Sequence, residues 1–280
     1  MRNGKFKKAL RRLLREKKAL AIPVTYLILF ASLIVIISLT YSFAVAKISA
    51  HGALLNASVA KQNMQALDDA VLSVAWSSGA SRVVYMDDCG GTFQTQPTAR
   101  NLVLNLTDEQ TFSDVVFNSS VGKVVYKLKP SQVSYEGLFI RGDYRAVTNQ
   151  SSSVVTQLYG ATADDAQELI LSYRPLVTTA MIGESDGKPL NLIRIYIVNL
   201  NSSQSLTLRE KFYLKVTAVN VSSTVYSYSF NSSVSSLALK ATFDNASGNT
   251  VQLQISSNAN GAVVRVEIVT CNIKIQRAVA

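Results

Sequence analysis

The chain has 280 residues, enough for one large domain or two small ones beside a membrane segment. Its formal net charge of +10 is concentrated at one end, because residues 1–18 carry nine basic and one acidic side chain while the other 262 residues carry a net charge of +2. This nearly neutral remainder lacks the basic surface on which DNA or RNA binding depends, so we expect no nucleic-acid partner.

Residues 1–19 are interpreted as a basic cytoplasmic leader. An excess of Lys and Arg on one flank of an apolar segment holds that flank in the cytoplasm and sends the rest of the chain outward. Residues 5–15 also fit a basic amphipathic helix on the inner membrane surface, whose apolar face comprises Phe6, Ala9, Leu10, Leu13 and Leu14. The topology signal is the favoured interpretation.

The segment from Ala19 to Ala46 contains 28 residues and no charge. A helix of this length spans about 42 Å, which exceeds the roughly 30 Å thickness of a bilayer's hydrocarbon core. Its apolar residues occupy every face, unlike those of a surface helix in a soluble domain. The pattern therefore predicts a transmembrane helix that begins near residue 20 and holds Pro23 in its first turn, where a missing N–H costs little.

Lys18-Ala19-Leu20 places a basic, a small and an apolar residue in order at the membrane edge. This motif, followed by AIPVTYLILF, resembles the class III signal peptide of archaeal type IV pilins. In that family a prepilin peptidase cuts between the small and the apolar residue. The resemblance implies cleavage after Ala19 and a mature N-terminus at Leu20. The fifth mature residue is then Val24, where bacterial pilins usually have glutamate, so the archaeal branch is favoured.

Another processing site remains open. Ala44-Val45-Ala46 has the A-x-A pattern of an ordinary signal peptidase site, and cleavage there would leave Lys47 as the N-terminus. The apolar run is about twice as long as the usual 7–15-residue core of a signal peptide, which disfavours this alternative.

Beyond Lys47 the pattern predicts an amphipathic continuation of the helix to about residue 78, with Gly79 as the stop. The predicted apolar stripe comprises Ile48, Leu55, Val59, Leu67, Val71 and Val74. The residues predicted to lie off the stripe are Lys61, Asn63, Gln65, Asp68 and Asp69. Residues 20–79 thus form one long helix, in which 20–46 suit a membrane or filament core and 47–79 suit packing on other helices or on a head domain. A stalk or a coiled coil is the alternative.

From about residue 80 the apolar period changes to two, with turn-forming clusters such as DDCGG, ESDGKP and NANG between short runs. Residues 80–280 are therefore predicted to form an extracellular, antiparallel β-rich, sandwich-like domain, which makes the fold class α+β. Residues 161–172 have an ambiguous pattern that also fits a short helix. A break near Glu184–Lys188 suggests two sub-sheets.

Eight Asn-x-Ser/Thr sequons follow the membrane segment, an excess for a chain with 17 asparagines. They indicate N-glycosylation of a surface protein at several sites, although Asn and Ser also gather in turns. The candidate sites are Asn56, Asn105, Asn118, Asn149, Asn201, Asn220, Asn231 and Asn245.

The chain has two cysteines, Cys89 and Cys271, both on the predicted outer side. An even number of cysteines in an oxidising location favours a disulfide, which here would close a long loop and contribute about 2–4 kcal/mol. Two separate buried thiols are the alternative. The spacing does not suggest a metal or redox site.

Little in the sequence points to catalysis. The single histidine, His51, follows the membrane segment, and no nucleophile, metalloprotease or phosphate-binding motif stands in its required context. The pairs Asp87-Asp88 and Asp164-Asp165 could be halves of a carboxylate or Ca²⁺ site, but solvated loop acids are the favoured interpretation. Arg141-Gly142-Asp143 is interpreted as a charged turn between strands, with an adhesive, integrin-binding motif as the disfavoured alternative. We therefore expect no enzymatic activity, no metal site and no cofactor.

Together the patterns and the resemblance predict a structural subunit of a type IV pilus-like filament at the cell surface. Its expected partners are the membrane, other pilin-like subunits and a prepilin peptidase. The head is large for a major pilin, which favours a minor or adhesive subunit. The alternative is a non-polymerising, membrane-anchored surface protein whose β domain binds a ligand; a membrane-anchored hydrolase is the least favoured class.

Overall fold

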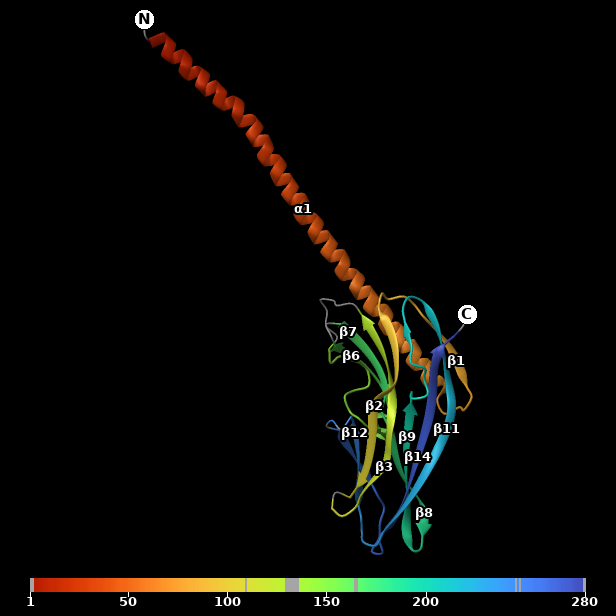
Figure 1. Ribbon diagram of the computed structural model, residues 1–280. Coiled ribbons are helices and arrows are strands. Elements are labelled where there is room, and N and C mark those ends of the chain that lie inside the picture. The colour runs from red at the N-terminus through yellow and green to blue at the C-terminus, as the bar shows by residue number, and fades with distance from the viewer. Residues whose placement is uncertain are drawn as a thin grey trace. The chain divides into compact units, whose positions relative to one another are not determined.

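The computed structural model describes residues 3–108, 110–128, 136–163, 166–244, 246 and 248–278, with side chains from residue 23 onward. Helix α1 covers Asn3–Val74, and every other element except the short 3-10 helix η1 (Gln150–Ser152) is a strand (Figure 1). The chain divides into two compact units, one ending at Gly52 and the other beginning at Ala53. The second unit therefore contains the last part of α1 together with all the strands.

The strands form two sheets. In the first sheet the order is β1 (Ser81–Met86), β11 (Phe212–Phe230), β14 (Ala262–Arg277), β9 (Lys188–Asn199), β8 (Leu176–Ser185) and β5 (Thr148–Asn149). In the second sheet the order is β13 (Asn249–Gln254), β12 (Ser236–Phe243), β2 (Thr92–Thr107), β3 (Ser113–Leu128), β7 (Ala166–Tyr173), β6 (Thr156–Ala163) and β4 (Phe139–Arg141), and β10 (Thr207–Leu208) pairs with β2. Neighbours are antiparallel except for β9–β14 and β5–β8, which are parallel. The predicted α+β class, a long apolar helix followed by a β-rich domain, is confirmed.

Two points of local structure are decided by the described residues. Within the ambiguous segment 161–172, residues 161–163 lie in β6 and residues 166–172 in β7, so the strand alternative holds there and the helix does not. Because β7 is buried on both faces, its side chains form a nearly continuous apolar run, which a period-based prediction does not distinguish from a short helix. The expected break near Glu184–Lys188 is the tight β8–β9 turn, where Asp186 (φ 54°) and Gly187 (φ 71°) adopt the left-handed conformation of a two-residue hairpin loop within one sheet.

The core has two apolar clusters. One is built on the last turns of α1, whose buried residues Ala60, Met64, Leu67, Val71 and Val74 recur at helical spacing and pack with strands of both sheets. The other cluster consists of strand and loop residues from the two sheets, without a helix. The second unit is therefore a β-sandwich with a helix built into part of its core.

The amphipathic half of α1 differs in part from its prediction. Leu67, Val71 and Val74 are buried as predicted, whereas Ile48 and Leu55 are 72% and 68% exposed. The helix ends at Val74 and not near residue 78, and the chain then reverses through positive φ angles at Trp76 and Gly79. The predicted stripe contains only branched apolar residues. Ala57, Ala60 and Ala70 lie outside it and are nevertheless buried, because their small side chains let the strands approach the helix closely.

Asn63 and Asp68 were predicted to lie off the stripe, and both are buried. Asn63 is held by the backbone of Asp87, because its Nδ2 donates to the Asp87 carbonyl at 2.8 Å and its Oδ1 accepts from the Asp87 N–H at 3.1 Å. A prediction of exposure from side-chain polarity is therefore wrong for Asn63 and Asp68, because polar groups can be buried where hydrogen-bond partners satisfy them.

This packing generates the first prediction. Leu67→Ala removes a fully buried side chain and is expected to lower the free energy of unfolding by about 2–5 kcal/mol. The control is Leu72→Ala in the same helix, which is 39% exposed and should cost less than about 1 kcal/mol. Denaturation of the full chain in detergent can be followed by fluorescence of Trp76, the single tryptophan, whose ring packs edge-on against Tyr196. Equal losses in the two variants would contradict this account.

Candidate membrane and assembly helix

Residues 23–46 of α1 form what we call the apolar segment. Every side chain in it is exposed, including Leu27 at 71% and Phe30 at 65%, and none of its residues is charged. These 24 residues rise about 36 Å as an α-helix, enough to cross the hydrocarbon core. Within the described part of the chain, α1 is the one helix that contains a stretch long and apolar enough for a membrane span. It is a candidate membrane anchor.

The polar atoms of the apolar segment are satisfied within the helix. Ser32 Oγ donates to the Leu29 carbonyl and Thr40 Oγ1 to the Ile36 carbonyl, each at 2.8 Å. Such bonds remove the cost of placing a hydroxyl group in hydrocarbon, where no water replaces a lost partner. At the C-terminal end of the segment, Lys47 Nζ lies 5.5 Å from the ring centre of Phe43, a combination typical of the membrane–water interface.

The predicted cleavage site at Lys18-Ala19-Leu20 lies in α1, and only its backbone is described. Because α1 begins at Asn3, Pro23 lies in the helix interior and not in the first turn as predicted for a helix starting near residue 20. Proline has no N–H, so the carbonyl four residues earlier, that of Ala19, loses its helical hydrogen bond. This is the carbonyl of the Ala19–Leu20 peptide bond, the bond that the family resemblance marks for cleavage.

A buried carboxylate fixes the last part of α1 to the second sheet. Asp68, with no exposed surface, accepts hydrogen bonds from Thr156 Oγ1 at 2.8 Å, Tyr173 Oη at 2.9 Å and Arg141 Nη1 at 2.5 Å. The same Arg141 atom donates to the exposed Asp69 at 2.8 Å. Burial, together with the nearby Asp68 charge, raises the pKa of Tyr173, and the bonds to Asp69 and Asp68 raise the pKa of Arg141. We call these five residues the Asp68 clamp.

The Arg141-Gly142-Asp143 segment follows its prediction in part. Arg141 ends β4 and Gly142 turns with φ 75°, so the segment is a charged turn. Both charged side chains are engaged, however, since Arg141 pairs with α1 and Asp143 forms ion pairs with Arg145 and the buried Arg174. These hydrogen bonds lower the pKa of Asp143, with Arg145 contributing most. The segment is therefore part of the domain's internal structure and not a free adhesive loop.

Most of the predicted glycosylation sites lie at the surface of the described structure. Asn56, Asn118, Asn201, Asn220 and Asn231 are exposed. Asn105 and Asn149 are partly buried and engaged, the former with Ser113 and the latter as the N-cap of η1. Asn245 lies outside the described residues. Exposure permits modification at the first five positions, and nothing in the structure tests whether it occurs.

The predicted disulfide between Cys89 and Cys271 is absent from this structure. Both thiols are buried in the same apolar cluster and both are free. Cys89 precedes β2 and faces the Tyr126 hydroxyl, whereas Cys271 lies on β14 opposite Val221, with the Trp76 backbone as its polar neighbour. Burial raises the pKa of each thiol. Both cysteines are therefore buried thiols in this structure, the alternative that the sequence left open beside a disulfide.

The other candidate chemical groups remain separate. His51 is exposed on α1, and Asp87 accepts from Tyr85 Oη and from the Asp88 N–H. Asp164 and Asp165 lie outside the described residues. The described residues contain no group of three His, Cys, Asp or Glu side chains placed to hold a metal ion. The Asp68 clamp was not predicted from the sequence. The one feature that could have indicated it is the Asp68-Asp69 pair within an amphipathic helical pattern.

Comparisons with known proteins return no match: no family model, no curated protein and no solved structure is similar to this chain at a significant level.

The clamp generates the second prediction. Asp68→Asn removes the charge that Arg141 and two hydroxyl groups meet in the core, and it should lower the free energy of unfolding by about 3 kcal/mol or more. Asp69→Asn alters a carboxylate that is 54% exposed and bonds to the same arginine, so a loss below about 1 kcal/mol is expected. Denaturation of both variants in detergent provides the comparison. A loss for Asp68→Asn no larger than that for Asp69→Asn would contradict the clamp.

Proposed function

We propose that this chain is a structural subunit of a type IV pilus-like filament on the cell surface, synthesised as a membrane-anchored precursor. The observation that carries the proposal is the apolar segment, which is exposed on all sides in the isolated chain. Two environments cover such a surface in succession: lipid before assembly, and the same segment of other copies after assembly.

The energetics restrict how the apolar segment leaves the membrane. Each Å² of apolar surface transferred to water costs about 25 cal/mol, so a helix exposed along its whole circumference needs replacement contacts at every step. Helices pack closely where small residues let their backbones approach, and the apolar segment has such residues along its length. They are Ala31, Ser32, Ser38, Ser42, Ala44 and Ala46.

The processing step is supported by the position of Pro23. A peptidase must draw its scissile bond out of a helix before cutting, and the cost of this local opening falls when a hydrogen bond is already missing. Pro23 removes the bond to the Ala19 carbonyl and leaves the rest of the apolar segment intact. After cleavage at Ala19, Pro23 becomes the fourth residue of the mature helix, where its missing N–H has no cost.

The excess of Lys and Arg in the leader supports an outer location for the β-rich unit. Exposed sequons on that unit fit N-glycosylation of an extracellular domain. The size of the head favours a minor or adhesive subunit over a major one.

A second candidate function is a non-polymerising, membrane-anchored surface protein that binds a ligand. An aromatic-lined pocket in the β-rich unit favours it, since such a pocket has a use whether or not the protein polymerises. The two functions differ in the fate of the apolar segment, which stays in lipid in this alternative.

The third prediction concerns processing. The mature protein should begin at Leu20, Lys18→Ala should block cleavage, and Pro23→Ala should slow it by restoring the helical hydrogen bond of the Ala19 carbonyl. Val24→Ala retains its N–H and is the matched control. Pulse labelling and N-terminal mass spectrometry in a host with a prepilin peptidase give both rate and site. Recovery of Lys47 as the N-terminus would instead identify an ordinary secreted protein.

The fourth prediction concerns assembly. Leu29 is 58% exposed at mid-segment, and Leu29→Asp should abolish the sheared-filament fraction because it places a charge where neighbouring helices must pack. Leu29→Met keeps the surface apolar and should assemble normally. Cells expressing each form are separated into membrane, filament and medium fractions. Absence of filaments for the unmodified protein, or normal filaments from Leu29→Asp, would favour the anchored binding protein.

A further inference from the structure

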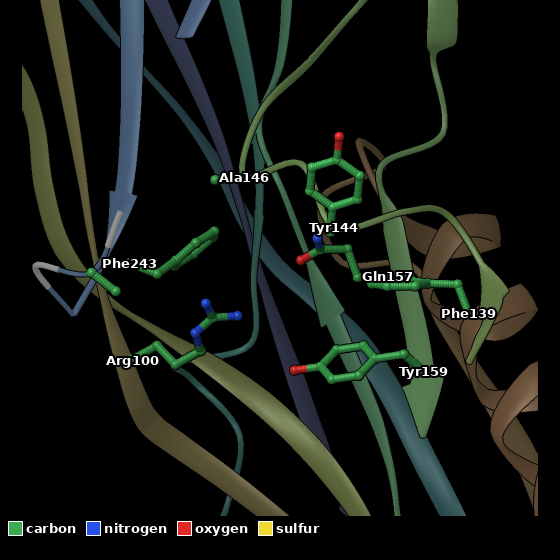
Figure 2. Close-up of a pocket in the computed structure, with 8 residues that line it drawn as sticks. Arg100, Phe139, Tyr144, Ala146, Gln157, Tyr159 and Phe243 are labelled. Carbon is green, nitrogen blue, oxygen red and sulfur yellow. The ribbon is translucent and has the colours of Figure 1, made fainter. Parts of the chain in front are cut away.

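A pocket of about 200 Å³ opens in the second unit between the β2–β12 region and the β4–β6 region (Figure 2). Its wall contains one cation, one amide and four aromatic rings: Arg100, Gln157, Phe139, Tyr144, Tyr159 and Phe243. Neither the filament proposal nor any sequence motif uses these residues. We call this site the aromatic pocket.

A bulge in β2 aims Arg100 into the aromatic pocket. The β2–β3 register shifts between Gln96 and Arg100, and Pro97, which cannot donate to a ladder, falls in that interval. The Arg100 guanidinium lies 3.9 Å from the ring centre of Phe243, and its Nε is 3.6 Å from Asp244 Oδ2. Neither Nη atom donates a hydrogen bond to any described residue. Arg100 is thus held by the Phe243 ring and by Asp244, and its two Nη groups have no hydrogen-bond partner among the described residues.

Tyr159 forms the opposite side of the aromatic pocket. Its ring packs against Phe139 with centroids 5.3 Å apart, and Figure 2 shows its hydroxyl group directed toward the Arg100 side chain. Burial raises the pKa of Tyr159, partly offset by the Arg100 charge, so the hydroxyl remains a neutral donor and acceptor at physiological pH. It has no hydrogen-bond partner within the described part of the chain.

Tyr144 stands at the mouth, 85% exposed, on a loop that the domain holds rigidly. The carbonyl groups on either side of it, those of Asp143 and Arg145, both accept from Gln157 Nε2, at 2.9 and 3.0 Å. The Arg145 carbonyl also accepts from the buried Arg174 at 3.1 Å. These bonds order the backbone that carries Tyr144, so its exposed ring is presented at the mouth without a cost for ordering the loop at binding.

These groups define the chemistry of a ligand. A guanidinium with two free donor groups matches a single carboxylate in a planar, bidentate geometry. The flanking rings suit the C–H faces of a small ring, and the Tyr159 and Tyr144 hydroxyls suit its hydroxyl groups. The volume is below the roughly 300–1,000 Å³ of pockets for drug-sized molecules, which restricts the buried part to about one sugar residue. A phosphate group would prefer more than one cation or a helix N-terminus, and neither lines this pocket.

We propose that the aromatic pocket binds the carboxylate-bearing sugar residue of an acidic glycan, with Arg100 on the carboxylate and Tyr144 on the face of the sugar ring. This role does not require filament formation, because the aromatic pocket lies wholly within the second unit. A protein that fails to polymerise still binds.

The fifth prediction tests this binding with the full chain in phosphatidylcholine nanodiscs. Ligand-observed saturation-transfer NMR compares methyl β-glucuronide with methyl β-glucoside, which lacks the carboxylate, and with acetate, which lacks the ring. Only the glucuronide should show strong transfer. Arg100→Gln should weaken its binding about tenfold, the effect of losing a charged hydrogen bond. Tyr144→Ala should weaken it about threefold or more through loss of ring contact.

Matched controls are available on other strands. Arg265→Gln changes an exposed arginine on β14 and Tyr226→Ala a tyrosine 36% exposed on β11, and both should bind like the unmodified protein. Circular dichroism checks the folding of each variant, and Tyr144→Ala decides the outcome if Arg100→Gln does not fold, since the exposed Tyr144 ring has no packing role. The proposal is overturned if no probe binds, if the glucoside or acetate binds as well as the glucuronide, or if the folded Arg100 and Tyr144 variants bind normally.

Discussion

The burial requirement of residues 23–46 determines how this chain can exist in a cell. The backbone of this helix satisfies its own polar groups, the hydroxyls of Ser32 and Thr40 bond to preceding carbonyls, and apolar side chains project in every direction. Hydrocarbon or an equally apolar protein surface is then the favourable environment, and water is not. The basic residues that precede the apolar segment favour one orientation of this helix in a membrane, because they resist transfer across it. The anchoring, orientation and assembly that we propose thus all rest on one stretch of sequence.

The same helix changes its environment within a few turns. After Gly52 it gains alanines at buried positions, and its larger apolar residues fall on one face, where two sheets cover them. Asp68 is buried there only because Arg141, Thr156 and Tyr173 supply three donors from three different strands or strand ends. A slide of the helix by one turn would separate the carboxylate from all three donors. The Asp68 clamp therefore fixes the register of residues 53–74 on the strands, which apolar packing alone would leave less sharply defined.

Predictions from sequence succeeded where one periodic property decides the structure. An uncharged run of 28 residues and a period of two after residue 80 were sufficient for the helix, the β-rich unit and the α+β class. Predictions were wrong where a distant part of the chain decides. Burial of Asn63 depends on the backbone of Asp87, and β7 is a strand because both its faces are covered. Cys89 and Cys271 are both free and buried in this structure, and an even cysteine count does not distinguish this state from a disulfide. Residues 1–22 show the remaining limit, since their pattern suggests a processing site and only an enzyme's action can test it.

The aromatic pocket was beyond sequence analysis for a related reason: its parts come from four separate strand regions and share no motif. Arg100 follows a bulge that contains a proline, and Phe243 ends a strand. Tyr144 directly follows the Arg141-Gly142-Asp143 segment, whose sequence suggested a charged turn between strands. What they share is groups without a hydrogen-bond partner among the described residues, namely two guanidinium nitrogens and two tyrosine hydroxyls, and an exposed ring on a loop whose backbone is held by buried side chains. Natural domains usually satisfy their polar groups internally or leave them in open water. The unpaired groups of the aromatic pocket differ from ordinary surface groups because they lie beside an ordered loop. Gln157 and Arg174 donate hydrogen bonds to the backbone of this loop when the domain folds. A ligand entering the aromatic pocket therefore meets a loop whose backbone entropy has already been lost on folding.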